Sequence, residues 1–217
     1  MKKLFGISLL SACLVIGLAF TEKDKEAKNF TPPGTIHLEE ANLFVDKNEV
    51  TNADWAEYLI ALKNEGFEEE YQNAKPDSAS WFSVYTGRQD AFQGEYAHYP
   101  VVGLSPKQIM DYCSWRSARV NAIHSNFKVR YRLPTVEDWE MLTKIVKKEK
   151  IKEGLYAYSQ KNSKKIKGVY DNVEEVIHGD DFVTAGFNKT EDQNLIYREE
   201  MPSAFVGFRC VAEVAPL

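Results

Sequence analysis

Cys113 and Cys210 constrain the fold of this chain more than any other pair of residues, because they are its only cysteines beyond residue 13. A bond between them would close a loop of about a hundred residues and stabilise the fold by roughly 4 to 5 kcal/mol in the simple chain-entropy model. Such bonds persist in oxidising compartments. Whether this one forms therefore depends on whether the chain is exported.

The N-terminal segment predicts export. Lys2 and Lys3 precede the uncharged stretch 4–20, LFGISLLSACLVIGLAF, which has the pattern of a signal sequence. Three interpretations are open. The run LSAC resembles a lipobox that would make Cys13 a lipidated N-terminus, the run GLA offers a cleavage site ending at Ala19, and the uncleaved stretch would be a short membrane anchor.

Export favours a disulfide between the two remaining cysteines, the alternative being two buried, unpaired thiols. The domain organisation that we expect is a signal peptide or lipoprotein anchor over 1–20, a charged tether over 21–29 and a single domain over 30–217. The expected location is the periplasm or, for the anchored form, the membrane of the cell envelope.

The charge of the chain argues against a nucleic-acid partner. The formal net charge is -5 and the sequence pI is about 5.5. A broad cationic field is what holds a phosphate backbone, and this composition does not supply one.

The first half of the domain predicts two short strands within 35–51 and then one helix. Thr51 or Asn52 would cap that helix and Gly66 would end it. Its buried face would carry Trp55, Leu59 and Leu62.

Residues 66–104 show no sustained hydrophobic period and are interrupted by glycines and prolines, so we expect a long aromatic loop region. Loops on a rigid scaffold are where partners often bind. The partner-binding side chains predicted here are Trp81, Tyr85, Phe92, Tyr96 and Tyr99.

Two further helices are predicted from their capping signals. Ser105 and Gln108 form a capping box for one helix, which would bury Cys113, and Thr135 and Asp138 do so for the next. The buried residues expected on these helices are Ile109, Cys113 and Val120 on the first and Trp139, Leu142 and Val146 on the second. Short strands are expected after Gly168, and a final strand would contain Cys210.

Several segments together resemble the formylglycine-generating enzyme or sulfatase-modifying factor family. The segments are YPVVGLSPKQIMDYCSWRSARVN, YRLPTVEDWE, DNVEEV and GFRCV, preceded by DKNEVTN near the start of the domain. The resemblance runs from Thr31 to the end of the chain. It implies an α+β, C-type-lectin-like fold, with short twisted antiparallel strands, two or three helices and many loops. It also implies that Cys113 and Cys210 are partners.

Enzymes of that family oxidise a cysteine of a client sulfatase to formylglycine, through two cysteines four residues apart that hold copper(I) shortly before the last strand. Soft thiolates are the ligands that copper(I) selects. This chain has no cysteine between Cys113 and Cys210, and its corresponding segment NKTEDQNLIYREEMPSA offers no thiolate. Copper is therefore not expected, and the resemblance favours a member without the family's oxidase activity.

The resemblance also bears on calcium and on partners. Asn172 and Glu175 match positions near the family's calcium site and have oxygen ligands, so the resemblance makes them candidate calcium ligands. Among branches of the family, the motifs are most similar to gliding-motility lipoproteins, which serve in an envelope machine for motility and protein secretion.

Three functions follow as hypotheses. The first is an exported, non-catalytic binding or scaffold domain of the cell envelope, with envelope proteins as partners. The alternative is an enzyme that modifies an exported client by another route. A third, glycan or glycoprotein binding, rests on the lectin-like fold alone.

Overall fold

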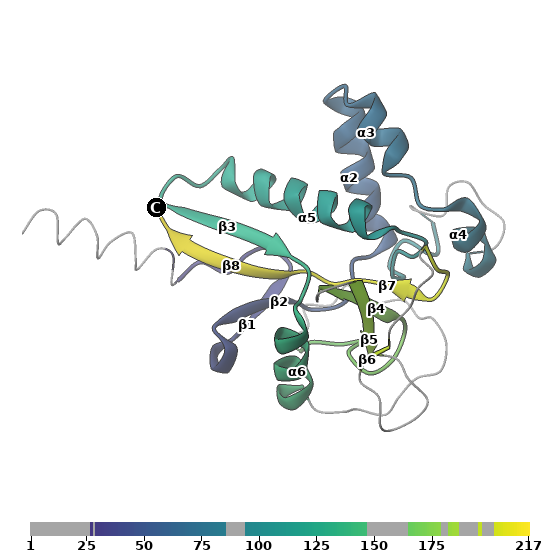
Figure 1. Cartoon of the computed structure of the whole chain (residues 1–217). Helices are drawn as coiled ribbons and strands as arrows, with labels where there is room; N and C mark the ends of the chain where they lie inside the picture. The colour runs from purple at the N-terminus through teal and green to yellow at the C-terminus, as the bar shows by residue number, and fades with distance from the viewer. Residues whose placement is uncertain are drawn as a thin grey trace, which may run out of the picture.

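The computed structural model describes residues 27, 29–85, 94–146, 165–178, 182–186, 195–196 and 202–217. Two four-stranded sheets and the helices around them make up this part of the chain (Figure 1). The predicted signal segment, Cys13 and Phe92 lie outside it.

The first sheet is antiparallel, with the strand order β1-β2-β8-β3. Its strands are β1 (Thr35–Leu38), β2 (Leu43–Asp46), β8 (Val211–Pro216) and β3 (Phe127–Arg132), and the 3-10 helix η1 (Glu39–Ala41) joins β1 to β2. The two short strands predicted within 35–51 are confirmed. The last strand lies at the centre of the sheet, so the end of the chain holds its two halves together.

The second sheet has the order β6-β5-β4-β7. Its strands are β4 (Glu174–His178), β5 (Phe182–Gly186), β6 (Leu195–Ile196) and β7 (Val206–Gly207). The pair β4–β7 is parallel and the other pairs are antiparallel. Cys210 falls between β7 and β8 rather than inside a strand, which corrects the sequence-based expectation.

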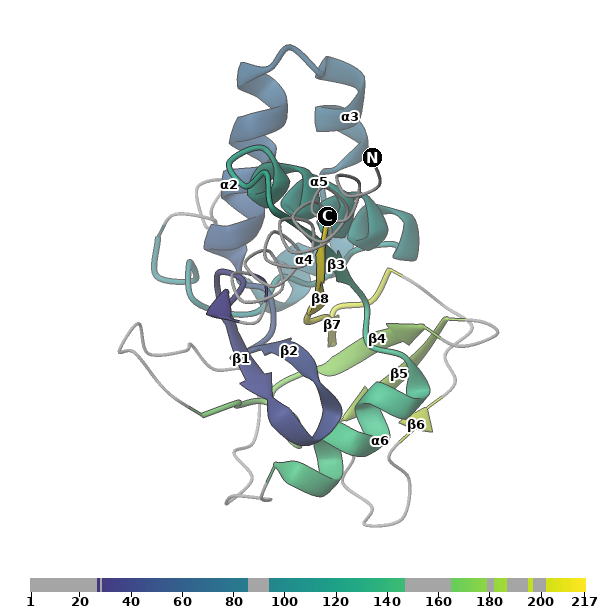
Figure 2. The ribbon, with the colours of Figure 1, turned by 90° about the vertical axis from the view of Figure 1, so that its left-hand side faces the viewer.

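Five α-helices are described, more than the two or three that were expected. They are α2 (Asn52–Asn64), α3 (Glu68–Asn73), α4 (Ser78–Val84), α5 (Pro106–Asn121) and α6 (Val136–Ile145). The additional helices α3 and α4 occupy part of the region expected to be loop. In both views α2 and α3 project from the body as a pair (Figures 1 and 2).

The predicted helix signals are confirmed. Capping boxes begin α2 at Thr51, α5 at Ser105 and α6 at Thr135. The buried residues match those predicted for each helix, except that Val146 is only partly buried. The opening of α6 is thus explained by helix capping rather than by catalysis.

Hydrophobic residues cover both faces of the first sheet. One face packs against α2 and α5 through a core that includes Trp55, Ile109 and Val129. The other packs against α6 and the second sheet through a core that includes Val45, Trp139 and Ile177. Because the central strand carries alternating side chains into both cores, the sheet is the rigid layer to which every site described below is attached.

The start of the domain, before β1, lies beside the end of the last strand. Ala27 is buried in the first core, so the expected tether contacts the domain there. The ring of Phe30 lies 4.5 Å from that of Phe127, and Phe127 pairs with Pro216 in the last strand. Among the described residues, no helix is both long and apolar enough to cross a bilayer.

Candidate functional site

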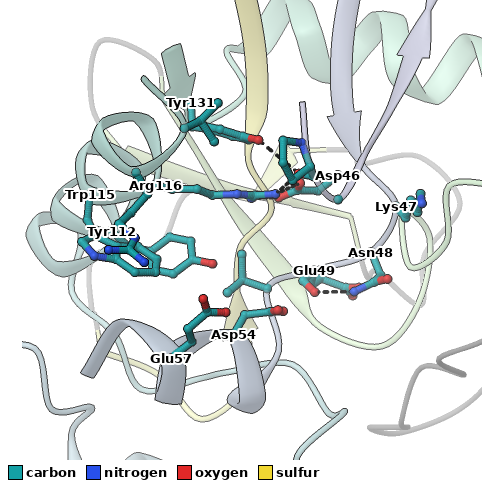
Figure 3. Close-up of a pocket in the computed structure, with 15 residues that line it drawn as sticks. Asp46, Lys47, Asn48, Glu49, Asp54, Glu57, Tyr112, Trp115, Arg116 and Tyr131 are labelled. Atoms are coloured by element: carbon teal, nitrogen blue, oxygen red, sulfur yellow. Dashed lines mark hydrogen bonds and ion pairs between the residues drawn. The ribbon is translucent and has the colours of Figure 1, made fainter. Parts of the chain in front are cut away.

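A pocket of about 360 Å³ opens between the first sheet and the helices α2 and α5 (Figure 3). We call it the Arg116 pocket. Its walls come from the turn before β1, the end of β2 and the segment after it, and the facing sides of α2 and α5. The lining residues are Pro33, Gly34, Asp46, Lys47, Asn48, Glu49, Val50, Asp54, Glu57, Tyr112, Trp115, Arg116, Arg119, Val120 and Tyr131.

A bidentate ion pair lies at the centre of this pocket. Arg116 donates to the two carboxylate oxygens of Asp46 at 2.7 and 2.8 Å and to the carbonyl of Pro33 at 2.7 Å. Its guanidinium also stacks on the ring of Tyr131, with the central carbon 4.1 Å from the ring centroid. Burial lowers the pKa of Arg116, but the charge of Asp46 more than offsets this, and the pKa stays well above its usual value.

Asp46 connects the pocket to the end of the chain. Its Oδ2 also accepts from the backbone N–H of Cys210 at 2.9 Å. The carboxylate is therefore satisfied by a helix on one side and by the segment before β8 on the other. Because both oxygens of Asp46 accept charge-assisted hydrogen bonds, which fix geometry closely, the pair of Asp46 and Arg116 has a structural role.

The rim of the pocket carries charges of both signs. Asp54 and Glu57 project from α2, and Asp54 also caps that helix at Thr51 (Figure 3). Lys47 follows β2, and Arg119 lies on α5, 3.6 Å from Glu65. The lining includes no serine, threonine, cysteine or histidine. The pocket therefore has polar groups suited to binding but lacks the side chains that most often act as nucleophile or as histidine base.

Aromatic rings form the remaining wall. Tyr112 stacks on Trp55 at 5.3 Å and lies 5.6 Å from Trp115. Burial raises the pKa of Tyr112 well above its usual value, and burial likewise raises that of Tyr131. Both phenols are therefore neutral at physiological pH and can act only as hydrogen-bonding and stacking groups.

The two predicted disulfide partners are in contact. Cys113 comes from the buried face of α5, and its sulfur lies 3.5 Å from that of Cys210, with both residues buried as thiols. Burial, together with Cys113 and Asp46, raises the pKa of the Cys210 thiol well above its usual value, while Arg116 opposes the shift. The structure thus brings the pair together, and the covalent bond itself stays a prediction.

The predicted calcium ligands are placed differently from a cation site. The carboxylate of Glu175 accepts from Arg209 Nε at 2.6 Å and from Nη2 at 2.5 Å, and Glu49 lies 3.8 Å from the same guanidinium. Asn172 is buried with a φ of 76°. As placed, these residues do not fit a bound calcium ion, because Arg209 would first have to leave Glu175. No cluster of three or more metal-binding side chains occurs within the described ranges.

Two of the predicted partner-binding aromatics, Trp81 and Tyr85, are buried, and Tyr96 and Tyr99 are partly buried. Trp81 and Tyr85 are 4% and 1% exposed and form a small core with Val102 and Val173, against which Tyr96 and Tyr99 pack. The Trp81 indole donates to Asn52 at 3.2 Å, and the Tyr85 hydroxyl donates to the carbonyl of Pro100. Trp81 and Tyr85 therefore stabilise α4 against the body and do not present a partner surface.

Sequence reasoning missed the Arg116 pocket. Arg116 lies three residues after Cys113 and so falls on the buried side of α5, where a charged residue needs a partner. That position was the only local signal. The partner, Asp46, lies 70 residues earlier in the chain, where nothing in the sequence connects the two.

Comparison with known proteins gives one finding. The model of the family described as the sulfatase-modifying factor enzyme 1-like domain matches residues 12–165, well over half of the chain. The match ends before β4, so the later GFRCV segment lies beyond it. Comparison with curated proteins and with solved structures gave no match. The antiparallel strands and helices agree with the C-type-lectin-like fold expected for this family. The chain therefore belongs to the sulfatase-modifying factor enzyme 1-like family.

Proposed function

We propose that this protein is an exported, non-catalytic member of the family that acts as a binding or scaffold domain of the cell envelope. One observation carries the proposal. The chain has no cysteine between Cys113 and Cys210, and these two are in contact in the core at 3.5 Å. No second pair of thiolates is present to hold copper(I) before the last strand, which is what the family's oxidase chemistry requires.

The Arg116 pocket supports a binding role. Tyrosine, tryptophan and arginine are the residues enriched at the centres of protein interfaces, and the pocket presents all three. The rim charges on α2 and on the facing walls supply polar contacts for a partner carrying both signs of charge. We place the entry point of the partner at the rim formed by Asp54 and Glu57.

Export and attachment are further parts of the proposal. The pattern of residues 4–20 favours export, and lipidation at Cys13 or an uncleaved anchor would keep the domain at the membrane. The similarity to gliding-motility lipoproteins makes a motility or secretion complex the first partner to examine.

The proposal is tested by mild crosslinking in envelope fractions, followed by capture of the full-length chain and mass spectrometry. We expect specific envelope proteins with the wild-type chain and fewer of them with Glu57→Lys, which reverses a charge on the pocket rim. Glu69→Lys makes the same change on α3, outside the pocket, and should capture as well as wild type. Recovery of the chain alone would count against a scaffold role.

An oxidase assay tests the enzyme alternative. The chain is incubated with a sulfatase-type cysteine peptide, with and without added copper, and conversion to the aldehyde is followed by mass spectrometry. We expect no conversion above a blank, and turnover would overthrow the non-catalytic assignment.

A further inference from the structure

A second pocket, of about 220 Å³, is lined by one residue of the cysteine pair, Cys113. We call it the Cys113 pocket. It lies between α5, the second half of β3 and the end of β4. Its lining residues are Met110, Cys113, Ser114, Arg130, Tyr131, Arg132, Leu133 and His178.

The two cysteines differ in their relation to this pocket. Cys113 lines it and is 4% exposed, whereas Cys210 is 0% exposed and does not line it. A reagent in the pocket would therefore meet Cys113 first. Cys210 is not in the lining, and its sulfur lies 3.5 Å from that of Cys113.

Among the described residues, the pocket is lined by basic groups and by no carboxylate. Arg130 is exposed on β3 and forms no ion pair with a described residue, and His178 faces it from the end of β4. Arg132 is paired with Asp138 at 2.5 Å and Glu213 at 2.7 Å, but neither acid lines the pocket. Glu213 is also the cross-strand partner of Arg130. Of the described groups, the arginines line the pocket and the acids do not, so an entering molecule lies closer to positive charge, which favours an anionic one.

We propose that the Cys113 pocket admits small anionic disulfides and thiols to Cys113, and that the cysteine pair is oxidised and reduced through this sulfur. In the first step Cys113 gives its proton to solvent and the resulting thiolate attacks a disulfide RSSR, forming a Cys113–SR mixed disulfide and releasing RS⁻. Cys210 then passes its proton to the released thiolate and attacks the Cys113 sulfur, which expels the second RS⁻. Two electrons pass from two cysteines to one small disulfide, and the internal disulfide is the product.

The environment of Cys210 affects the second step. Because burial holds Cys210 in its thiol form, its attack is slow at neutral pH, and the mixed disulfide on Cys113 should persist long enough to be observed. The proposal does not depend on the binding function argued above, since it concerns only how the pair changes oxidation state.

Charged methanethiosulfonate reagents test the proposal on the full-length, fully reduced chain. Each transfers its RS group to a thiolate and releases methanesulfinate, and acid-quenched peptide mapping gives separate rates for Cys113 and Cys210. At low salt we expect the sulfonate reagent to modify Cys113 faster than the trimethylammonium reagent by roughly tenfold, with Cys210 modified last. The uncharged methyl reagent should fall between them.

Two variants on the same strand provide the control. Arg130→Glu should abolish or invert the preference for the anionic reagent. Lys128→Glu makes the same charge change two residues away on the same exposed side of β3 but outside the pocket, and should keep most of the preference. Equal rates for the three reagents, modification of Cys210 before Cys113, or equal effects of the two variants would each overturn the proposal.

Discussion

Two arginines, Arg209 and Arg119, differ in burial, and this difference decides what each contributes to stability. Arg209 is fully buried between Glu175 and Glu49, while Arg119 and its partner Glu65 are 60% and 45% exposed and 3.6 Å apart. Removing one member of a buried ion pair leaves an uncompensated charge, whereas an exposed pair contributes little.

We therefore expect Arg209→Met to lower the free energy of unfolding by about 3–5 kcal/mol. Arg119→Met should change it by less than about 1 kcal/mol. Urea titrations followed by circular dichroism measure both values. Similar losses for the two variants would show that the Arg209 cluster is not the stabilising charge network described here.

Two glycines have similar left-handed backbone conformations but different surroundings. Substituting each by alanine therefore distinguishes the cost of backbone strain from the cost of steric overlap. Gly66 and Gly103 have φ values of +80° and +74°. A Cβ at Gly66 meets nothing within 4 Å, whereas at Gly103 it would lie 3.1 Å from the carbonyl of Asp77 and 3.3 Å from the Cβ of Ser80.

Gly66→Ala should destabilise by about 1–2 kcal/mol, the strain of a left-handed residue with a side chain. Gly103→Ala should destabilise by about 1–3 kcal/mol more, because the new methyl group presses on the start of α4. Thermal unfolding of the two variants side by side gives the difference. Equal losses would mean that α4 can move away without cost.

At the scale of elements, α5 closes the edge of the first sheet. The Asn121 side chain donates to the carbonyl of Val129 at 2.9 Å and accepts from its N–H at 2.8 Å, and the Ser117 hydroxyl accepts from Tyr131 N–H at 2.8 Å. These bonds occupy backbone groups of β3 that would otherwise be open to another strand. Edge strands left open are sites of aggregation.

Asn121→Ala should lower stability by about 1–3 kcal/mol, because it leaves two backbone groups of β3 without their partners. It should also promote association through β3, which analytical ultracentrifugation detects. The matched change Ser114→Ala removes a hydroxyl of α5 that bonds only to Met110 within the helix. A monomeric, fully stable Asn121→Ala protein would contradict the role given to this side chain.

Elements with local signals could be predicted from the sequence, and the others could not. The capping boxes at Ser105 and Thr135 act within one turn, so they locate α5 and α6 without tertiary information. The helix α3 buries no residue and α4 buries only Trp81, so neither produces a periodic stripe. The Arg116 pocket was missed because its central ion pair joins residues far apart in the chain.

For the whole molecule, buried tyrosines predict sensitivity to alkali. Burial, with smaller effects from Asp111 and Glu70, raises the pKa of Tyr58 from 10.0 to about 12, and burial raises those of Tyr85, Tyr112 and Tyr131. The folded state therefore keeps protons that the unfolded chain loses. By linkage, this stabilisation is complete below pH 10 and is lost as the pH rises through the folded values.

We expect the urea midpoint to fall steadily between about pH 10 and pH 12. Tyr58→Phe should make the fall shallower, since phenylalanine does not titrate. Equilibrium unfolding at a series of alkaline pH values measures both curves. A midpoint that is independent of pH over this range would contradict the linkage.

The meeting of Phe30 with Phe127, and of Phe127 with Pro216, gives the domain neighbouring points of attachment for whatever precedes and follows it. A domain whose two ends lie close together can be inserted into a surface loop of a host protein without separating the two ends of that loop. The same geometry would let this domain be attached to a neighbouring protein through one end, so that its opposite end stays accessible for other contacts.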